Sequence, residues 1–173
     1  MKTIVFSILF GLALSTSLLW SATDTRTPSA NLKVSFDDVT EFTDFVLHHL
    51  SEEQTKVMFE RQLDRYWKAR LGRLVPSGHT LELHFKDIDM AGRMWPARNP
   101  ARPELRYMEE AYPPRLVFTY RLLDEAGEVV AEGEENIRDT RFRRRPGSGG
   151  EIRHQYAFAY EFEILRQWAR RTL

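Results

Sequence analysis

The sequence predicts an α+β protein: a two-layer sandwich in which a four-stranded, mainly antiparallel sheet carries two amphipathic helices on one face. Three observations predict this fold. Four segments alternate apolar and polar residues, as strands with one face in water do. Two further segments repeat apolar residues at helical spacing. These segments follow one another in the order β-α-β-β-β-α, and helices gathered on one face of such a sheet define the α+β class.

Length and composition limit the class of protein. The chain has 173 residues, enough for one domain with its own core. It has no cysteine, which excludes a disulfide framework, a zinc–thiolate site and a cysteine nucleophile. Lys and Arg number 25, as do Asp and Glu, so the formal net charge is zero. This balance argues against a globally basic nucleic-acid-binding protein, and we expect no nucleic-acid partner.

Residues 1–22 have the pattern of a secretory signal peptide. Lys2 precedes an apolar run over 4–14, and no charge occurs between Lys2 and Asp24. A cut after Ala22 leaves Trp20 where a small residue is usual, so an uncleaved inner-membrane anchor over 4–22 stays open as the alternative. Both interpretations place the body outside the cytoplasm, in the periplasm of a Gram-negative host. We expect a linker at 23–31 and a single domain at 32–173.

The first strand and helix come next along the chain. Residues 32–36 alternate and predict a strand. Ser51-Glu52-Glu53-Gln54 fits a capping box, in which the Ser hydroxyl and the Gln side chain each satisfy a free backbone N–H. The helix that follows carries one apolar stripe, made of Phe59, Leu63, Tyr66, Trp67, Leu71 and Leu74. Gly72 and Pro76 mark its end.

In the second predicted strand, the alternation of apolar and polar residues changes phase. Residues 81–85 alternate, but after Lys86 the apolar side chains switch parity, and Asp87 and Asp89 occupy the positions of the apolar face. Either a β-bulge reverses the faces near Lys86, or Asp87 points toward the edge of the core and needs a hydrogen-bonding or cationic partner. In the proline-rich segment 91–114, we expect a short helix over 104–111 with Pro103 at its first position.

The rest of the chain predicts a hairpin and a second helix. Residues 116–122 and 129–137 alternate as strands, and the turn between them places Gly127 in the left-handed position. The last helix is expected over 156–171, where Arg170 and Arg171 suit its C-terminus. Between strand and helix lies a loop over 138–153 with six arginines against two acids, a local charge of +4.

This basic loop is the best binding candidate. Guanidinium groups suit phosphate and carboxylate, so Arg141, Arg143, Arg144 and Arg145 are expected to bind an anionic envelope component. Lipid head groups, lipopolysaccharide and peptidoglycan have that chemistry, and an envelope protein is a further partner to consider. The alternative is a solvated loop whose charge keeps the protein soluble.

Asp87 and Asp89 form the candidate carboxylate pair, since residues i and i+2 of a strand share a face. The alternative is structural, with Asp87 accepting hydrogen bonds from a turn or from Arg115 or Arg121. We expect no metal site, because no two of the five histidines have the i, i+4 spacing and the adjacent His48 and His49 are expected to point apart. There is no Gly-rich phosphate loop before a helix, and we expect no cofactor.

Two runs carry a family resemblance: Asp-Ile-Asp-Met-Ala-Gly at 87–92 and Tyr-Pro-Pro-Arg at 112–115. With the first strand, residues 131–135 and the aromatic last helix, they resemble a bacterial family known as domain of unknown function 3016. The resemblance covers nearly all of the chain after the signal segment, and the segment at 143–150 departs from it. It implies a small exported protein and no assigned activity. We therefore expect a non-enzymatic envelope-associated binding or accessory protein, with a carboxylate-dependent periplasmic hydrolase using Asp87 and Asp89 as the alternative.

Overall fold

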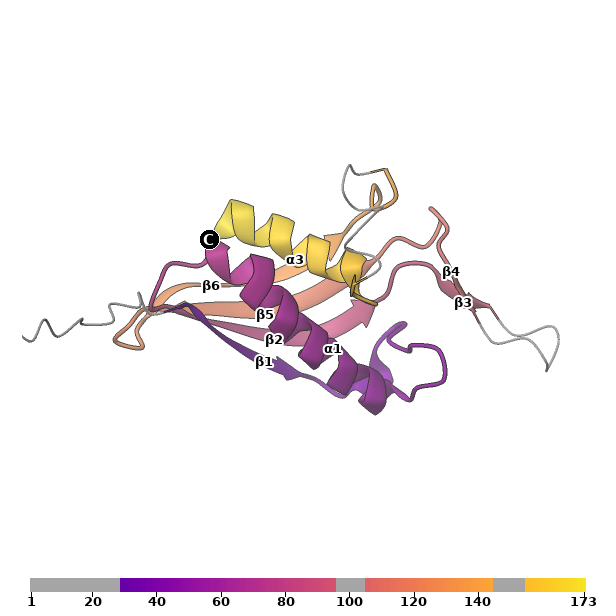
Figure 1. Ribbon diagram of the computed structural model, residues 1–173, viewed down its shortest axis with the longest axis horizontal. Helices are drawn as coiled ribbons and strands as arrows, with labels where there is room; N and C mark the ends of the chain where they lie inside the picture. Colours follow the sequence, from indigo (N-terminus) through magenta and orange to yellow (C-terminus); the bar gives the residue numbers. More distant parts are fainter. Residues whose placement is uncertain (1–28, 96–104, 145–154) are drawn as a thin grey trace, which may run out of the picture.

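The computed structural model describes residues 29–95, 105–144 and 155–173. Its main sheet has the strand order β1-β2-β5-β6, with β1 at Asn31–Phe36, β2 at Thr80–Asp89, β5 at Arg115–Leu123 and β6 at Val129–Arg138. A second sheet pairs β3, Arg93–Trp95, with β4, Leu105–Tyr107. The two helices are α1, Glu52–Tyr66, and α3, Ala159–Thr172 (Figure 1).

The α+β class is confirmed, but the main sheet is mixed. β5 is antiparallel to both of its neighbours, whereas β1 runs parallel to β2. The physical reason lies in the connection: α1 carries the chain back along the sheet before β2 begins, and such a crossover joins parallel strands. The predicted element order is also incomplete, because β3 and β4 lie between β2 and β5.

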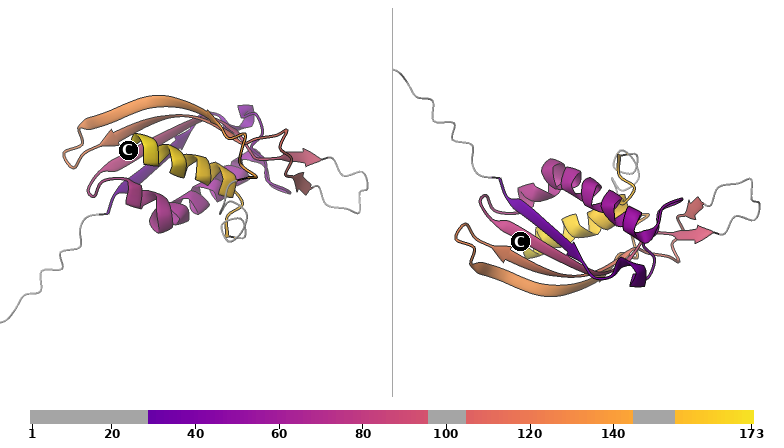
Figure 2. Two further views of the ribbon diagram at one scale, coloured as in Figure 1. Left: turned by 90° about the horizontal axis from the view of Figure 1, so that it is seen from above. Right: turned by 90° about the horizontal axis from the view of Figure 1, so that it is seen from below.

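Both helices lie against the same face of the main sheet (Figure 2). The predicted capping box opens α1: Gln54 N–H donates to the Ser51 hydroxyl, and the Ser51 N–H donates to the Gln54 side chain. Beyond Tyr66 the helix continues as a π-helical turn, Trp67–Leu71, and then a 3₁₀ turn, Gly72–Leu74. The hairpin is also confirmed, with Gly127 at φ +87°.

The core between helices and sheet is largely aromatic. Phe59 of α1 is fully buried at its centre. Five other phenylalanine rings have centroids 4.9–5.9 Å from its own: Phe36, Phe45, Phe85, Phe158 and Phe162. Trp168 of α3 packs edge-on against Phe118 of β5 at 5.0 Å. Packing of this kind supplies the hydrophobic stabilisation that the fold needs without any disulfide.

The β-bulge in β2 is confirmed. The register with β5 shifts between Phe85 and Asp87. As a result Phe85 and Ile88 both lie in the core, although they are three residues apart, and Asp87 and Asp89 lie at the opposite face. The bulge therefore decides where the candidate carboxylates point.

The predicted helix over 104–111 is wrong, because Leu105–Tyr107 form strand β4. The strand places the Arg106 side chain inward and leaves Tyr107 half exposed. Gly92 allows the close approach, because its φ is +78° and a Cβ there would overlap the Tyr107 carbonyl. Within the described part of the chain, no helix has the length and hydropathy needed to cross a membrane.

Candidate functional site

The uncovered face of the main sheet is polar and its charges are mutually paired. Glu82 accepts from Lys33 at 3.0 Å and from Arg121 at 3.3 Å, so one carboxylate links three adjacent strands. Lys86 pairs with Glu134 at 2.9 Å. Exposed pairs of this kind contribute about 0–1 kcal/mol each and mainly fix side-chain positions.

Asp87 is held by three donors at one end of this face. Its Oδ1 accepts from the Thr43 N–H at 2.8 Å, and its Oδ2 accepts from the Thr43 hydroxyl at 2.9 Å and from Arg115 at 3.0 Å. The turn and arginine contacts expected in the structural interpretation are therefore present. Arg115 also donates to Asn136, which fixes its guanidinium.

Asp89, the other member of the pair, lies in a different environment. Burial raises its pKa above the usual aspartate value, and the negative charge of Asp44 adds to this. Asp44 is next to it because the chain after β1 returns to the edge of β2, where Met90 N–H donates to the Asp44 carbonyl. Arg138 pairs with Asp89 at 3.8 Å.

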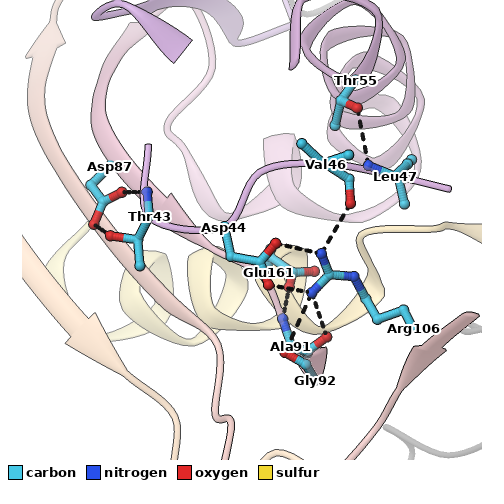
Figure 3. A network of polar contacts seen from close by, with 10 residues as sticks. All are labelled: Thr43, Asp44, Val46, Leu47, Thr55, Asp87, Ala91, Gly92, Arg106 and Glu161. Atoms are coloured by element: carbon cyan, nitrogen blue, oxygen red, sulfur yellow. Dashed lines mark hydrogen bonds and ion pairs between the residues drawn. The ribbon is translucent and has the colours of Figure 1, made fainter. Parts of the chain in front are cut away.

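Arg106 lies at the centre of the cluster beside these aspartates (Figure 3). Its guanidinium donates to both carboxylate oxygens of Asp44, at 2.7 and 2.9 Å, and to the Val46 carbonyl at 3.0 Å. The side chain is only 8% exposed. Sequence reasoning missed this contact, because its two partners lie 62 residues apart. Arg106 thus fastens β4 to the loop between β1 and α1.

Glu161 of α3 is the buried acid of the same cluster. Its Oε1 accepts from the Ala91 N–H at 2.7 Å, and the residue is 1% exposed. Burial raises the pKa of Glu161 to about 6, while the Ala91 hydrogen bond and the charge of Arg106 act in the opposite direction. Asp44 is the second charge facing it and raises the pKa further.

This environment makes a pH-dependent prediction for Glu161→Gln. Because the native pKa is about 6 and the unperturbed value is 4.5, the folded state binds the proton more tightly than the unfolded chain. The carboxylate therefore costs stability that grows as the pH rises from 4.5 to 6 and reaches ~2 kcal/mol above that window. Urea unfolding should find the variant more stable than the wild type by up to ~2 kcal/mol at neutral pH and equal to it near pH 4. A constant difference at both pH values would contradict the prediction.

His48 and His49 do not point apart as expected: their ring centroids are 3.4 Å from each other. His49 has φ 60°, a left-handed conformation that turns its side chain back over its neighbour. Among the described residues, no group of three or more His, Cys, Asp or Glu has an arrangement that could hold a metal ion.

The predicted anion-binding arginines lie after β6, except that Arg145 is outside the described residues. The segment 139–144 is a series of turns anchored on both sides. Phe142 is buried and packs edge-on against Tyr160 at 4.9 Å, and the Asp139 side chain accepts from the Arg141 N–H at 3.0 Å. Arg144 donates twice to Glu110, at 3.0 and 3.2 Å. Arg141 and Arg143 are left exposed on this anchored turn.

A Ser–His–Asp chain on the open face was also missed. His84 contacts the Ser35 hydroxyl through Nδ1 and the Asp37 carboxylate through Nε2, both at 2.9 Å. Acyl transfer would also need donors for an oxyanion. The two cations on the neighbouring strands, Lys33 and Arg121, are both paired with Glu82. We therefore assign these three side chains, Ser35, His84 and Asp37, to the network of polar contacts on this face of the sheet.

The fold and these sites define a small mixed-sheet α+β protein with a buried guanidinium–carboxylate cluster and an exposed basic turn. The chain belongs to the family described as Protein of unknown function (DUF3016), whose sequence model matches residues 30–171. A comparison with curated proteins finds no match.

Proposed function

We propose that this protein is an exported, envelope-associated binding protein that recognises an anionic surface through Arg141 and Arg143. Export rests on the signal-like pattern of residues 1–22, which lie outside the described residues. The periplasmic location follows from that pattern for a Gram-negative host.

One observation carries the binding role: two guanidinium groups are exposed on a turn that is itself fixed. Phe142, between them, is buried, so the turn cannot collapse onto the body and remove the arginines from solvent. Arg144 is bound to Glu110 and thereby holds the end of the turn. A charged surface on an ordered support binds with less entropic cost than one on a mobile loop.

The test is binding to phosphatidylcholine vesicles with and without phosphatidylglycerol. The double variant Arg141→Gln/Arg143→Gln should bind the anionic vesicles roughly 30-fold more weakly at low salt, since each basic residue near such a surface contributes about 1 kcal/mol. Wild-type binding should fall steeply as salt shortens the Debye length to about 10 Å or less.

The matched control is Arg61→Gln/Arg65→Gln, which removes the same charge from the exposed side of α1. Its vesicle binding should equal that of the wild type at each salt concentration. If both double variants lose affinity equally, net charge rather than this turn governs binding, and the proposal fails.

The hydrolase alternative has less support in the geometry. Both oxygens of Asp87 already accept hydrogen bonds from Thr43 and Arg115, so this carboxylate has its acceptor capacity largely used. Burial raises the pKa of Asp89, as a general acid requires, but Asp87 is not free to act as its partner.

A further inference from the structure

A cavity of about 500 Å³ opens between the end of α1 and α3, away from the sites described above. Figure 1 shows the C-terminal ends of the two helices side by side. Four arginines line the cavity, two from the turns after α1 and two from α3: Arg70, Arg73, Arg166 and Arg170. The remaining lining residues are Ala69, Leu74, Gln155 and Tyr156. No acid is among these described lining residues.

Most of this positive charge is uncompensated. Arg166 donates to Glu163, with Nε 2.8 Å from Oε2. Arg70, Arg73 and Arg170 form no ion pair with any residue that the structure describes. Arg166 and Arg170 are four residues apart on one helix, a spacing at which like charges destabilise a helix. Among the described residues, only one of the four lining arginines, Arg166, is therefore paired with an acid.

The C-terminal ends of the two helices explain only in part why four arginines gather here. The free carbonyl groups at the C-terminus of a helix favour nearby cations, by typically 0.3–1 kcal/mol each. Arginines whose side chains pointed away from one another into solvent would gain the same stabilisation from the helix C-termini. It does not explain why the arginines of two helices border the same cavity.

A buried hydroxyl at the inner side of the cluster is a second, independent observation. Tyr66 is fully buried, and no hydrogen bond of ordinary geometry reaches its hydroxyl from the described residues, although the Arg166 guanidinium lies close enough to interact with it. Burial first, and then the charge of Glu163, raise the pKa of Tyr66 to about 12, so the hydroxyl stays protonated and is a donor. The charges of Arg70 and Arg166, both in the cavity lining, act on the same hydroxyl. A buried hydroxyl donor beside two of the lining arginines adds to the positive potential behind the cavity, although Tyr66 itself is not among the lining residues.

The local backbone brings the first arginine pair to this place. The turn Trp67–Leu71 is π-helical, which displaces Arg70 from the regular helical position. Single π-helical turns inside α-helices occur frequently at functional sites. Here the turn is fixed by the Trp67 indole N–H, which donates to the Ala30 carbonyl at 3.2 Å.

We propose that this arginine pocket binds a small anion with two phosphoryl groups. Planar guanidinium groups match phosphoryl oxygens in pairs, and three unpaired arginines suit the charge of a diphosphate better than that of a single phosphate. The volume exceeds what one phosphate ion fills, while Leu74 and Tyr156 offer an apolar wall to the remainder of a larger ligand.

Calorimetric titration of the full chain with inorganic pyrophosphate tests the proposal, with orthophosphate and citrate as comparison anions. We expect saturable binding of pyrophosphate at millimolar concentration or below, and weaker binding of the other two. The variant Arg70→Gln/Arg170→Gln should lose roughly 100-fold in affinity, about tenfold for each charged contact. Pyrophosphate should also raise the melting temperature of the wild type but not that of this variant.

Controls separate this pocket from the basic turn. The variant Arg141→Gln/Arg143→Gln should bind pyrophosphate with the affinity of the wild type, whether or not its binding to anionic vesicles is weakened. Arg70→Lys/Arg170→Lys keeps the charge without the fork and should lose most of the preference for pyrophosphate over orthophosphate. Absence of binding at millimolar pyrophosphate, equal binding of citrate, or unchanged affinity in Arg70→Gln/Arg170→Gln would each overturn the proposal.

Discussion

Replacing Phe59 with alanine is expected to lower the free energy of unfolding by about 3–5 kcal/mol. The ring is fully buried, and rings from β1, β2, α3 and the loop before α1 surround it. The helices and the sheet therefore cannot all move in to fill the space that the ring leaves. Since domains of this size are stable by roughly 5–15 kcal/mol, the variant should approach instability near body temperature. Urea unfolding followed by circular dichroism measures the loss.

The matched control for this prediction is Val57→Ala on the same helix. Val57 is 45% exposed and lies outside the aromatic cluster, so its truncation should change stability by no more than ~0.5 kcal/mol. A comparable loss in both variants would indicate that helix propensity, not packing in the core, determines the stability of α1.

Arg106→Gln is expected to cost about 2–4 kcal/mol, because it leaves the Asp44 carboxylate without its cation in a partly buried site. The value lies below that for a fully buried pair, since Asp44 remains 28% exposed and water screens part of its charge. Hydrogen exchange should also accelerate in β4, which this guanidinium fastens to the body. Urea unfolding at neutral pH gives the magnitude.

Arg138→Gln serves as the control for the buried cluster. Arg138 pairs with Asp89 at 3.8 Å and is half exposed, so its removal should cost less than ~1 kcal/mol and leave exchange in β4 unchanged. If Arg106→Gln costs no more than Arg138→Gln, the cluster has no special role in holding the small sheet.

The sequence revealed the elements whose signals are local. The capping box at Ser51, the turn at Gly127 and the phase change after Lys86 each depend on neighbouring residues, and all three correspond to observed features. The direction of β1 could not be predicted in this way. Alternation shows which side chains face the core, and it is the same for parallel and antiparallel strands.

The candidate sites were harder to predict because their partners are distant in sequence. Arg106 lies 62 residues from Asp44, and nothing in the proline-rich segment indicates that its side chain turns inward. The arginine pocket poses the same difficulty. Residues 166 and 170 have visible helical spacing, but only the packing of the two helices shows that Arg70 and Arg73 border the same cavity.

The parallel pairing of β1 has a consequence for biosynthesis. A nascent chain emerges from its N-terminus, and the backbone partner of each β1 residue is made 49 residues later, since Lys33 lies opposite Glu82. Until residues 80–85 are available, β1 and α1 have no sheet on which to assemble, and the apolar side chains of both remain in solvent. The N-terminal half is therefore not an independent folding unit. β1 therefore cannot form its native sheet contacts before residues 80–85 have been synthesised.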